Sequence, residues 1–201
     1  MLKNSVEYKR FVWELSSIID CSLNDKAVTN INNTTILNNY KNITFICIGT
    51  NLIIGDAFGP IVGSVLKNTI GKKNRIKIIG DLKNCITYNN IKDKIKNIKK
   101  MYSNDIIIVL DSAISDKSDI GKVFIQNRGL KYGESLKKEN ECIGDISIKA
   151  VVCEQMYDNI SNFKNLTQVS ENQIQNVCSL VSLGIIDVLN KKGNFGKNIY
   201  K

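Results

Sequence analysis

The strongest constraint on the fold is a regular succession of short apolar runs and helix-length amphipathic segments. Residues 43–48 and 105–110 are continuous apolar runs of strand length, which is typical of strands buried on both faces. Between them lie two helical patterns, at 58–70 and 91–101, separated by a short strand pattern at 75–80. Strand, helix, strand, helix, strand predicts a parallel sheet joined by right-handed crossovers.

The flanking segments add further elements. Residues 4–20 carry apolar side chains at helical spacing and precede a polar stretch, 24–39. Residues 123–126 and 146–152 have strand patterns on either side of a long polar segment. A last helix begins at Ser170, where Gln173 completes a capping-box pattern.

These patterns predict one α/β domain over residues 1–201. We expect three layers: a mostly parallel, twisted sheet of about five strands, with helices on both faces and an additional N-terminal helix. The predicted subdivision is an N-terminal helix and linker at 1–40, an α/β core at 41–190 and a tail at 191–201.

The chain contains no histidine. This absence removes the Ser-His-Asp and Cys-His nucleophile systems, the HExxH zinc helix and every His-ligated metal centre. Its six cysteines are scattered without a CxxC pair, which argues against disulfides and a zinc site. Any hydrolysis must therefore use carboxylates, lysine, hydroxyls, thiols or a metal bound by carboxylates.

Charge and hydropathy restrict the partners and the location. No apolar run approaches the roughly 20 residues that cross a bilayer, and Glu7 and Glu14 interrupt any secretory signal, so we expect a cytoplasmic protein without a membrane span. The net charge of +9 suits acidic protein partners. Lysine and asparagine are spread along the whole chain rather than gathered in a stripe, which argues against a nucleic-acid partner.

Two aspartates stand where a ligand site is expected, outside the carboxyl ends of parallel strands. Asp56 follows a glycine-containing turn, and Asp111 directly follows the run 105–110. Each has a structural alternative, since Asp56 could cap the next helix and Asp111 could start a turn. A phosphate-binding loop is a further alternative, but neither GxGxxG nor GxxxxGK[ST] is present, and Asp56 would repel a phosphate.

Three segments carry a family resemblance: CIGTN (47–51) with GDAFGP (55–60), DSA (111–113) and GDISI (144–148). They closely resemble the YyaC-type sporulation proteins of endospore-forming bacteria, regarded as spore proteases, over about residues 43–190. More distantly, they are similar to the germination protease and the hydrogenase maturation endopeptidases, which share a phosphorylase/hydrolase-like α/β fold.

The resemblance implies that Asp56 and Asp111 match the catalytic aspartates of the germination protease and two metal-contacting acids of the hydrogenase group. Two departures from these families bear on the site. Asn51 stands where the YyaC-type pattern usually has Asp. The histidine of the hydrogenase-type metal site has no counterpart in this chain, which argues against nickel sensing.

If the two carboxyl groups face each other, they cannot both ionise easily, so one retains a proton. The ionised acid can take a proton from a water that attacks a peptide carbonyl, while its partner hydrogen-bonds the carbonyl oxygen. We expect backbone N–H groups of the turn to stabilise the oxyanion. The remaining expected substrate-binding residues are Gly49, Thr50, Asn51, Gly55 and Asp145.

The predicted function is a peptidase-like hydrolase of sporulation or germination, located in the forespore or the mother cell. It would cleave a protein or peptide, such as an acidic spore protein, without a cofactor. Two alternatives stay open at this point. One is a non-catalytic member that binds a peptide or protein in the same cleft, and the other is a hydrolase that holds a divalent metal on the same carboxylates.

Overall fold

The computed structural model describes residues 2–24, 27–29, 35–37, 42–73, 75–87, 89–102, 104–131 and 142–191, with backbone only at 23–24, 27–29, 35–37 and 99. The predicted tail beyond residue 191 and most of the polar segment 127–144 lie outside these residues. In the part of the chain that is described, no helix is long and apolar enough to span a membrane.

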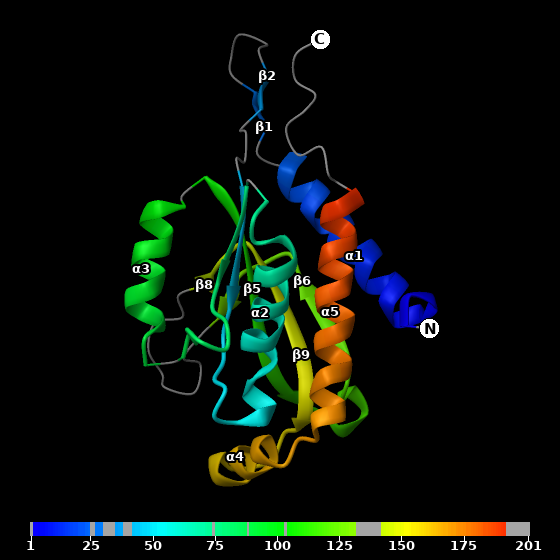
Figure 1. The fold of residues 1–201 in the computed structure, drawn as a ribbon. Helices are drawn as coiled ribbons and strands as arrows, with labels where there is room; N and C mark the ends of the chain where they lie inside the picture. Colours follow the sequence, from blue (N-terminus) through cyan, green and yellow to red (C-terminus); the bar gives the residue numbers. More distant parts are fainter. Residues whose placement is uncertain are drawn as a thin grey trace.

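A five-stranded sheet forms the centre of the molecule (Figure 1). Its strands, in spatial order, are β4 (Ile76–Ile79), β3 (Asn42–Cys47), β5 (Asp105–Ser115), β9 (Ile146–Glu154) and β6 (Val123–Gln126). The first four run parallel, and β6 pairs antiparallel with β9. The mostly parallel sheet of about five strands is therefore confirmed.

Helices cover both faces of this sheet. The helices of the described residues are η1 (Leu2–Asn4), α1 (Val6–Asn24), η2 (Ile54–Asp56), α2 (Phe58–Ile70), α3 (Ile91–Met101), η3 (Lys117–Asp119), α4 (Asn159–Thr167) and α5 (Glu171–Lys191). Figure 1 shows α3 on one face and α1, α2 and α5 on the other, so the predicted three layers are confirmed.

Alternate residues of the central strands supply two separate cores. Ile106, Ile108 and Leu110 of β5 pack in the larger core under α1, α2 and α5. Val109 packs in the smaller core under α3, together with Ile95 of that helix. Because side chains alternate between the faces of a strand, burial on both faces explains the continuous apolar runs in the sequence.

Four features differ from the sequence-based expectations. β5 does not stop before Asp111 but continues to Ser115. The predicted linker contains a pair of antiparallel strands, β1 (Ala27–Thr29) and β2 (Thr35–Leu37). A second small pair, β7 (Leu130–Lys131) and β8 (Cys142–Ile143), lies within the predicted polar segment. Helix α4 (Asn159–Thr167) is also absent from the sequence-based expectations, and only Leu166 of its apolar residues packs against the larger core.

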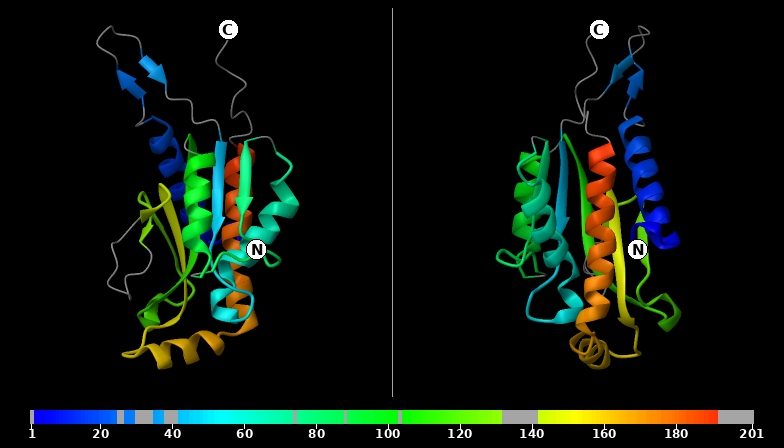
Figure 2. Two further views of the ribbon diagram at one scale, coloured as in Figure 1. Left: turned by 90° about the vertical axis from the view of Figure 1, so that its left-hand side faces the viewer. Right: turned by 45° about the vertical axis from the view of Figure 1, so that its right-hand side comes forward.

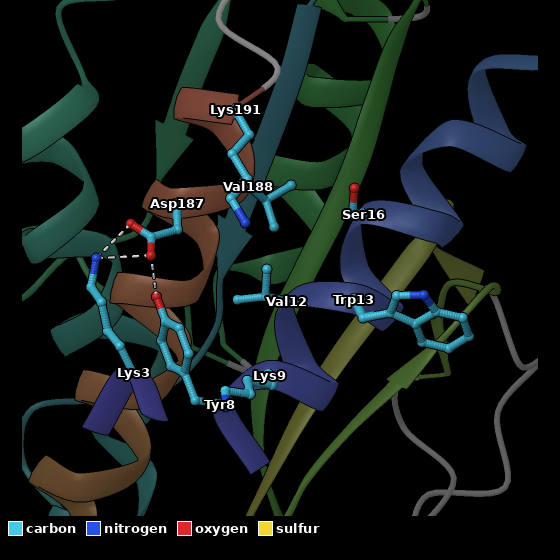
Figure 3. Close-up of a pocket in the computed structure, with 9 residues that line it drawn as sticks. All are labelled: Lys3, Tyr8, Lys9, Val12, Trp13, Ser16, Asp187, Val188 and Lys191. Carbon is cyan, nitrogen blue, oxygen red and sulfur yellow. Dashed lines mark hydrogen bonds and ion pairs between the residues drawn. The ribbon is translucent and has the colours of Figure 1, made fainter. Parts of the chain in front are cut away.

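Helix α1 is fixed to α5 by polar contacts as well as by packing. Figure 3 shows Lys3 and Tyr8 directed at Asp187 of α5, with the Tyr8 hydroxyl donating to its carboxylate at 2.6 Å. This contact and burial raise the pKa of Tyr8. A hollow of about 430 Å³ remains beside these residues, and the exposed Trp13 lies at its border.

Two glycines allow α2 to lie directly on the sheet. A Cβ at Gly59 would stand 2.0 Å from the carbonyl oxygen of Ile48, and one at Gly63 would stand 2.1 Å from that of Gly80. Both neighbours are backbone atoms, which cannot rotate away as a side chain could. The spacing of four residues places both glycines on one face of the helix. Their close contacts set the distance of α2, and of the turn before it, from the sheet.

We predict that Gly63→Ala destabilises the fold by about 1–3 kcal/mol, because the overpacking cost exceeds the gain of about 1 kcal/mol in helix propensity. Urea unfolding measures the difference. The matched control is Val65→Ala on the exposed side of the same helix, which should change stability by no more than about 0.5 kcal/mol. A stabilised Gly63→Ala variant would show that α2 has room to move away from the sheet.

Candidate active site

The candidate site lies where β3 ends and β5 continues. The last residues paired between these strands are Cys47 and Leu110, after which the Ile48 N–H donates to the Leu110 carbonyl at 2.8 Å. Asp111 is the next residue of β5, and beyond this point β5 pairs with β9 alone. The side of Asp111 that faces away from β9 is therefore open to the turn that follows β3.

That turn closes tightly on itself and brings Asp56 back to the end of β3. Gly49 has a φ of +137°, and a Cβ there would stand 2.0 Å from the Asp56 carbonyl oxygen. The same oxygen accepts the Thr50 N–H at 3.0 Å, and the Asp56 N–H donates to Ile53 at 2.9 Å. Only glycine fits at position 49, because any side chain would collide with the residue that the turn presents.

Asp56 does not serve as the N-cap of the next helix. Ala57 occupies the N-cap position of α2, and no side-chain capping hydrogen bond is formed there. Asp111 does not start a turn either, since it lies within β5 and pairs in register with Lys149 of β9. Both structural alternatives for the two aspartates are therefore absent from the described geometry.

Burial raises the pKa of both carboxyl groups, and they are close enough for the charge of Asp56 to act on Asp111. Burial raises the pKa of Asp56 to about 6, although a backbone hydrogen bond from Thr50 opposes the shift. Burial, followed by the negative charge of Asp56, raises the pKa of Asp111 to about 8, and the positive charge of Lys149 partly opposes this. Two acids with separated pKa values divide into an ionised and a protonated partner near neutral pH.

Lys149 is a third member of this group that sequence reasoning missed. In neighbouring parallel strands, paired residues project from the same face of the sheet, so the Lys149 and Asp111 side chains lie side by side. The available signal was a lysine in the otherwise uncharged run from Ile146 to Cys153. A charge on a central strand is costly to bury without a partner, and here two carboxyl groups lie nearby.

A family model described as "Protein of unknown function (DUF1256)" matches residues 19–186. The chain belongs to this family. Within it, a protein of Bacillus subtilis (strain 168) described as "Uncharacterized protein YyaC" is 30% identical over 148 residues, which span 72% of this chain and 68% of that protein. The predicted YyaC-type resemblance is thereby confirmed.

Two solved structures show a similar fold. The [NiFe] hydrogenase maturation protease HycI from Thermococcus kodakarensis KOD1 has a TM-score of 0.50 and 19% identity, covering 75% of this chain and 93% of that one. A peptidyl-tRNA hydrolase in complex with N-propanol has a TM-score of 0.53 and 8% identity, covering 78% and 91%. The predicted hydrolase-like α/β fold of this DUF1256 chain is confirmed, and at such identities the likeness concerns the fold alone.

The turn residues predicted to bind substrate have differing surroundings. Gly49 and Thr50 use their N–H groups within the protein, toward Ile86 and Asp56. Asn51 is exposed, and its amide donates to the Leu82 carbonyl at 3.1 Å. Gly55 is buried against α4, where a Cβ would stand 2.7 Å from the Leu166 carbonyl oxygen. Its structural part is thus to let the turn rest on α4.

The structure does not bring Asp145 to the aspartate pair. The Asp145 carboxylate accepts the Ile107 N–H at 2.9 Å, and its own N–H donates to the Ile107 carbonyl at 2.8 Å. Ile107 lies four residues before Asp111 along β5, a separation of about 13 Å at the usual rise per strand residue. Asp145 therefore supports the start of β9, toward the amino ends of the parallel strands and away from the aspartate pair.

Few side chains near the aspartate pair could act as metal ligands. Within the described ranges, no group of three or more His, Cys, Asp or Glu side chains is placed to hold a metal ion. The site instead combines two carboxyl groups with the ammonium group of Lys149. A cation on the protein reduces the attraction of the carboxylates for a metal, so this arrangement favours proton transfer between acids.

We predict that Asp111→Asn makes the protein more stable at alkaline pH. A carboxyl group with a raised folded-state pKa binds more protons folded than unfolded, so wild-type stability falls between about pH 4 and about pH 8. Asparagine does not titrate. The gain in unfolding free energy should exceed about 1 kcal/mol at pH 9 and shrink toward zero near pH 4.

Urea unfolding across this pH range measures the effect, and Asp116→Asn is the control because Asp116 is an exposed carboxyl just after β5. An equal gain from Asp111→Asn at every pH would mean that charge at position 111 is not its cause.

Proposed function

We propose that this DUF1256 chain is a peptidase-like hydrolase of sporulation or spore germination, in which Asp56 and Asp111 form the catalytic pair. The observation that carries the proposal is a pair of buried carboxyl groups with raised pKa values at the carboxyl end of a parallel sheet, where the charge of Asp56 acts on Asp111. Perturbed acids at this edge are the usual signature of acid–base chemistry.

The pKa order assigns the roles. Near neutral pH, Asp56 is largely ionised and acts as the general base, while Asp111 keeps its proton. Asp56 takes a proton from water as the water oxygen attacks the peptide carbonyl carbon, and Asp111 hydrogen-bonds the carbonyl oxygen. When the C–N bond breaks, the proton held by Asp56 passes to the leaving amine, which restores both acids.

Lys149 can share the role that was expected of the turn's backbone N–H groups. The N–H groups of Gly49 and Thr50 already donate to backbone carbonyls, so they are not available to an oxyanion. The Lys149 ammonium group is beside Asp111 and can stabilise negative charge as it develops on the carbonyl oxygen. It also limits the rise in the Asp111 pKa, so that this acid can still release its proton.

The proposed biological setting is supported by the family resemblance and by the similarity to a protein of Bacillus subtilis, an endospore former. The net charge of +9 favours an acidic protein substrate by long-range attraction. We place this activity in the cytoplasm of the forespore or the mother cell, with no resident cofactor.

We predict that the purified protein cleaves polypeptides in an acid extract of spore proteins, and that Asp56→Asn and Asp111→Asn each lower the rate at least about 10²-fold. Mass spectrometry of the fragments is the measurement. The control is Asp116→Asn, which should cleave at the wild-type rate. Undiminished cleavage by either pair variant would refute the aspartate mechanism.

A chelator separates the alternatives in the same assay. Cleavage that resists chelation supports the acid pair, whereas loss on chelation would favour a divalent metal on the same carboxylates. A protein that retains peptides without producing fragments would favour the binding alternative.

We further predict a bell-shaped pH profile. The rate should rise as Asp56 ionises near pH 6 and fall as Asp111 loses its proton near pH 8. Lys149→Gln should move the alkaline limb to higher pH, because it removes a charge that lowers the Asp111 pKa. Initial rates from pH 4 to pH 10 test both points, and a rate that keeps rising above pH 9 would exclude a protonated Asp111 from the reaction.

A further inference from the structure

Helix α4 turns two of its three apolar side chains outward. Ile160 is 83% exposed and Phe163 is 57% exposed, and the preceding Tyr157 is fully exposed beside the partly exposed Met156. We call these four residues the α4 surface. A helix on a globular protein normally directs its apolar residues toward the core. In α4 only Leu166 does so, and the helix is therefore largely inverted. Clustered exposed apolar side chains mark interaction sites.

Hydrogen bonds on the inner face of α4 hold it in this orientation. The Asn162 side chain accepts the Met156 N–H at 2.7 Å and donates to the Met156 carbonyl at 3.3 Å. Asn165 donates to the Glu154 carbonyl at 3.2 Å. Asp158 caps the helix by accepting the Ser161 N–H at 2.9 Å. Polar side chains and Leu166 fasten the helix to the protein, and Ile160 and Phe163 are left for another partner.

The α4 surface lies at the same end of the molecule as the aspartate pair. Figures 1 and 2 show α4 lying across the carboxyl ends of the strands, below η2 and the end of β9. Gly55, the residue before Asp56, packs against the Leu166 carbonyl of α4. The turn that carries Asp56 also exposes Leu52, at 88%. A chain bound at the pair would therefore meet apolar side chains as it leaves the site.

The size of the α4 surface indicates the kind of occupant. A stable interface between folded proteins uses about 20–30 residues on each side, far more than the four residues of this surface, so a second copy of this chain is a poor match. A short segment, in contrast, is held by only a few apolar anchors. The exposed Lys164 on the same helix and the net charge of +9 favour acidic residues beside those anchors, at the end of the helix away from the Asp158 carboxylate.

We propose that the α4 surface docks an unfolded, apolar and acidic segment of the polypeptide whose peptide bond reaches Asp56 and Asp111. The choice of occupant rests on the proposed function. Docking outside the reacting atoms selects polypeptides that expose apolar residues, and a folded protein does not present such a segment.

Binding is tested apart from cleavage in the Asp111→Asn background, which lacks the proposed chemistry. The probe is a fluorescein-labelled peptide of about 12 residues made of Glu, Gly and Leu, compared with the same peptide carrying Ser in place of Leu. Fluorescence anisotropy gives the affinities. We expect the Leu peptide alone to bind, and Ile160→Ser with Phe163→Ser to weaken it about tenfold or more.

The matched control is Trp13→Ser, an exposed apolar residue on α1 at 70% exposure, which should leave binding unchanged. Thermal melting checks that the α4 variants remain folded, and Phe163→Ser alone serves if the double variant does not. Equal affinity for both peptides, or full affinity in the α4 variants, would overturn the docking proposal even if cleavage were observed. Binding lost in the α4 variants would support it even if no cleavage occurred.

Sedimentation velocity tests the remaining alternative, in which a second copy of this chain occupies the α4 surface. We expect the wild-type protein and the α4 double variant to sediment alike. A wild-type dimer that the α4 substitutions dissociate would assign the surface to a second copy and overturn the proposal.

Discussion

The backbone of Gly49 lies against the carbonyl oxygen of Asp56, and this contact closes the turn between β3 and α2. The turn has to close so tightly because β3 stops pairing at Cys47 while β5 continues. Gly59 then lets α2 rest on the end of β3. The turn thus brings Asp56 back to the end of β3. There it lies close to Asp111, at the point where β5 no longer pairs with β3.

The same geometry has a cost for stability. Two carboxyl groups that are partly buried and close together resist ionisation, and the fold must supply enough core to tolerate them. The larger core, formed by β-strand residues with α1, α2 and α5, supplies the stability that offsets this cost. Lys149 lowers the cost by placing a positive charge beside Asp111. A site that destabilises its own fold is common where activity requires perturbed acids.

Several elements could be predicted because their signals are local. The runs that became β3 and the first part of β5 are apolar on both faces, and the stripes of α2 and α3 follow helical spacing. The Ser170 cap of α5 is present, with the Gln173 N–H donating to its hydroxyl, although the Gln173 side chain donates to Val152 instead. Elements whose partners are distant were missed, namely the extension of β5 along β9 and the inverted helix α4.

The sequence by itself determined the succession of buried strands and amphipathic helices, the absence of imidazole chemistry and the presence of an aspartate after each of two continuous apolar runs. These properties depend on residue type and on spacing along the chain, which are visible without a fold. The tertiary structure alone decided that Asp56 perturbs Asp111, that Lys149 joins them and that Asp145 does not. Strand register and the closing of the turn set those distances, and both arise from contacts between residues far apart in the sequence.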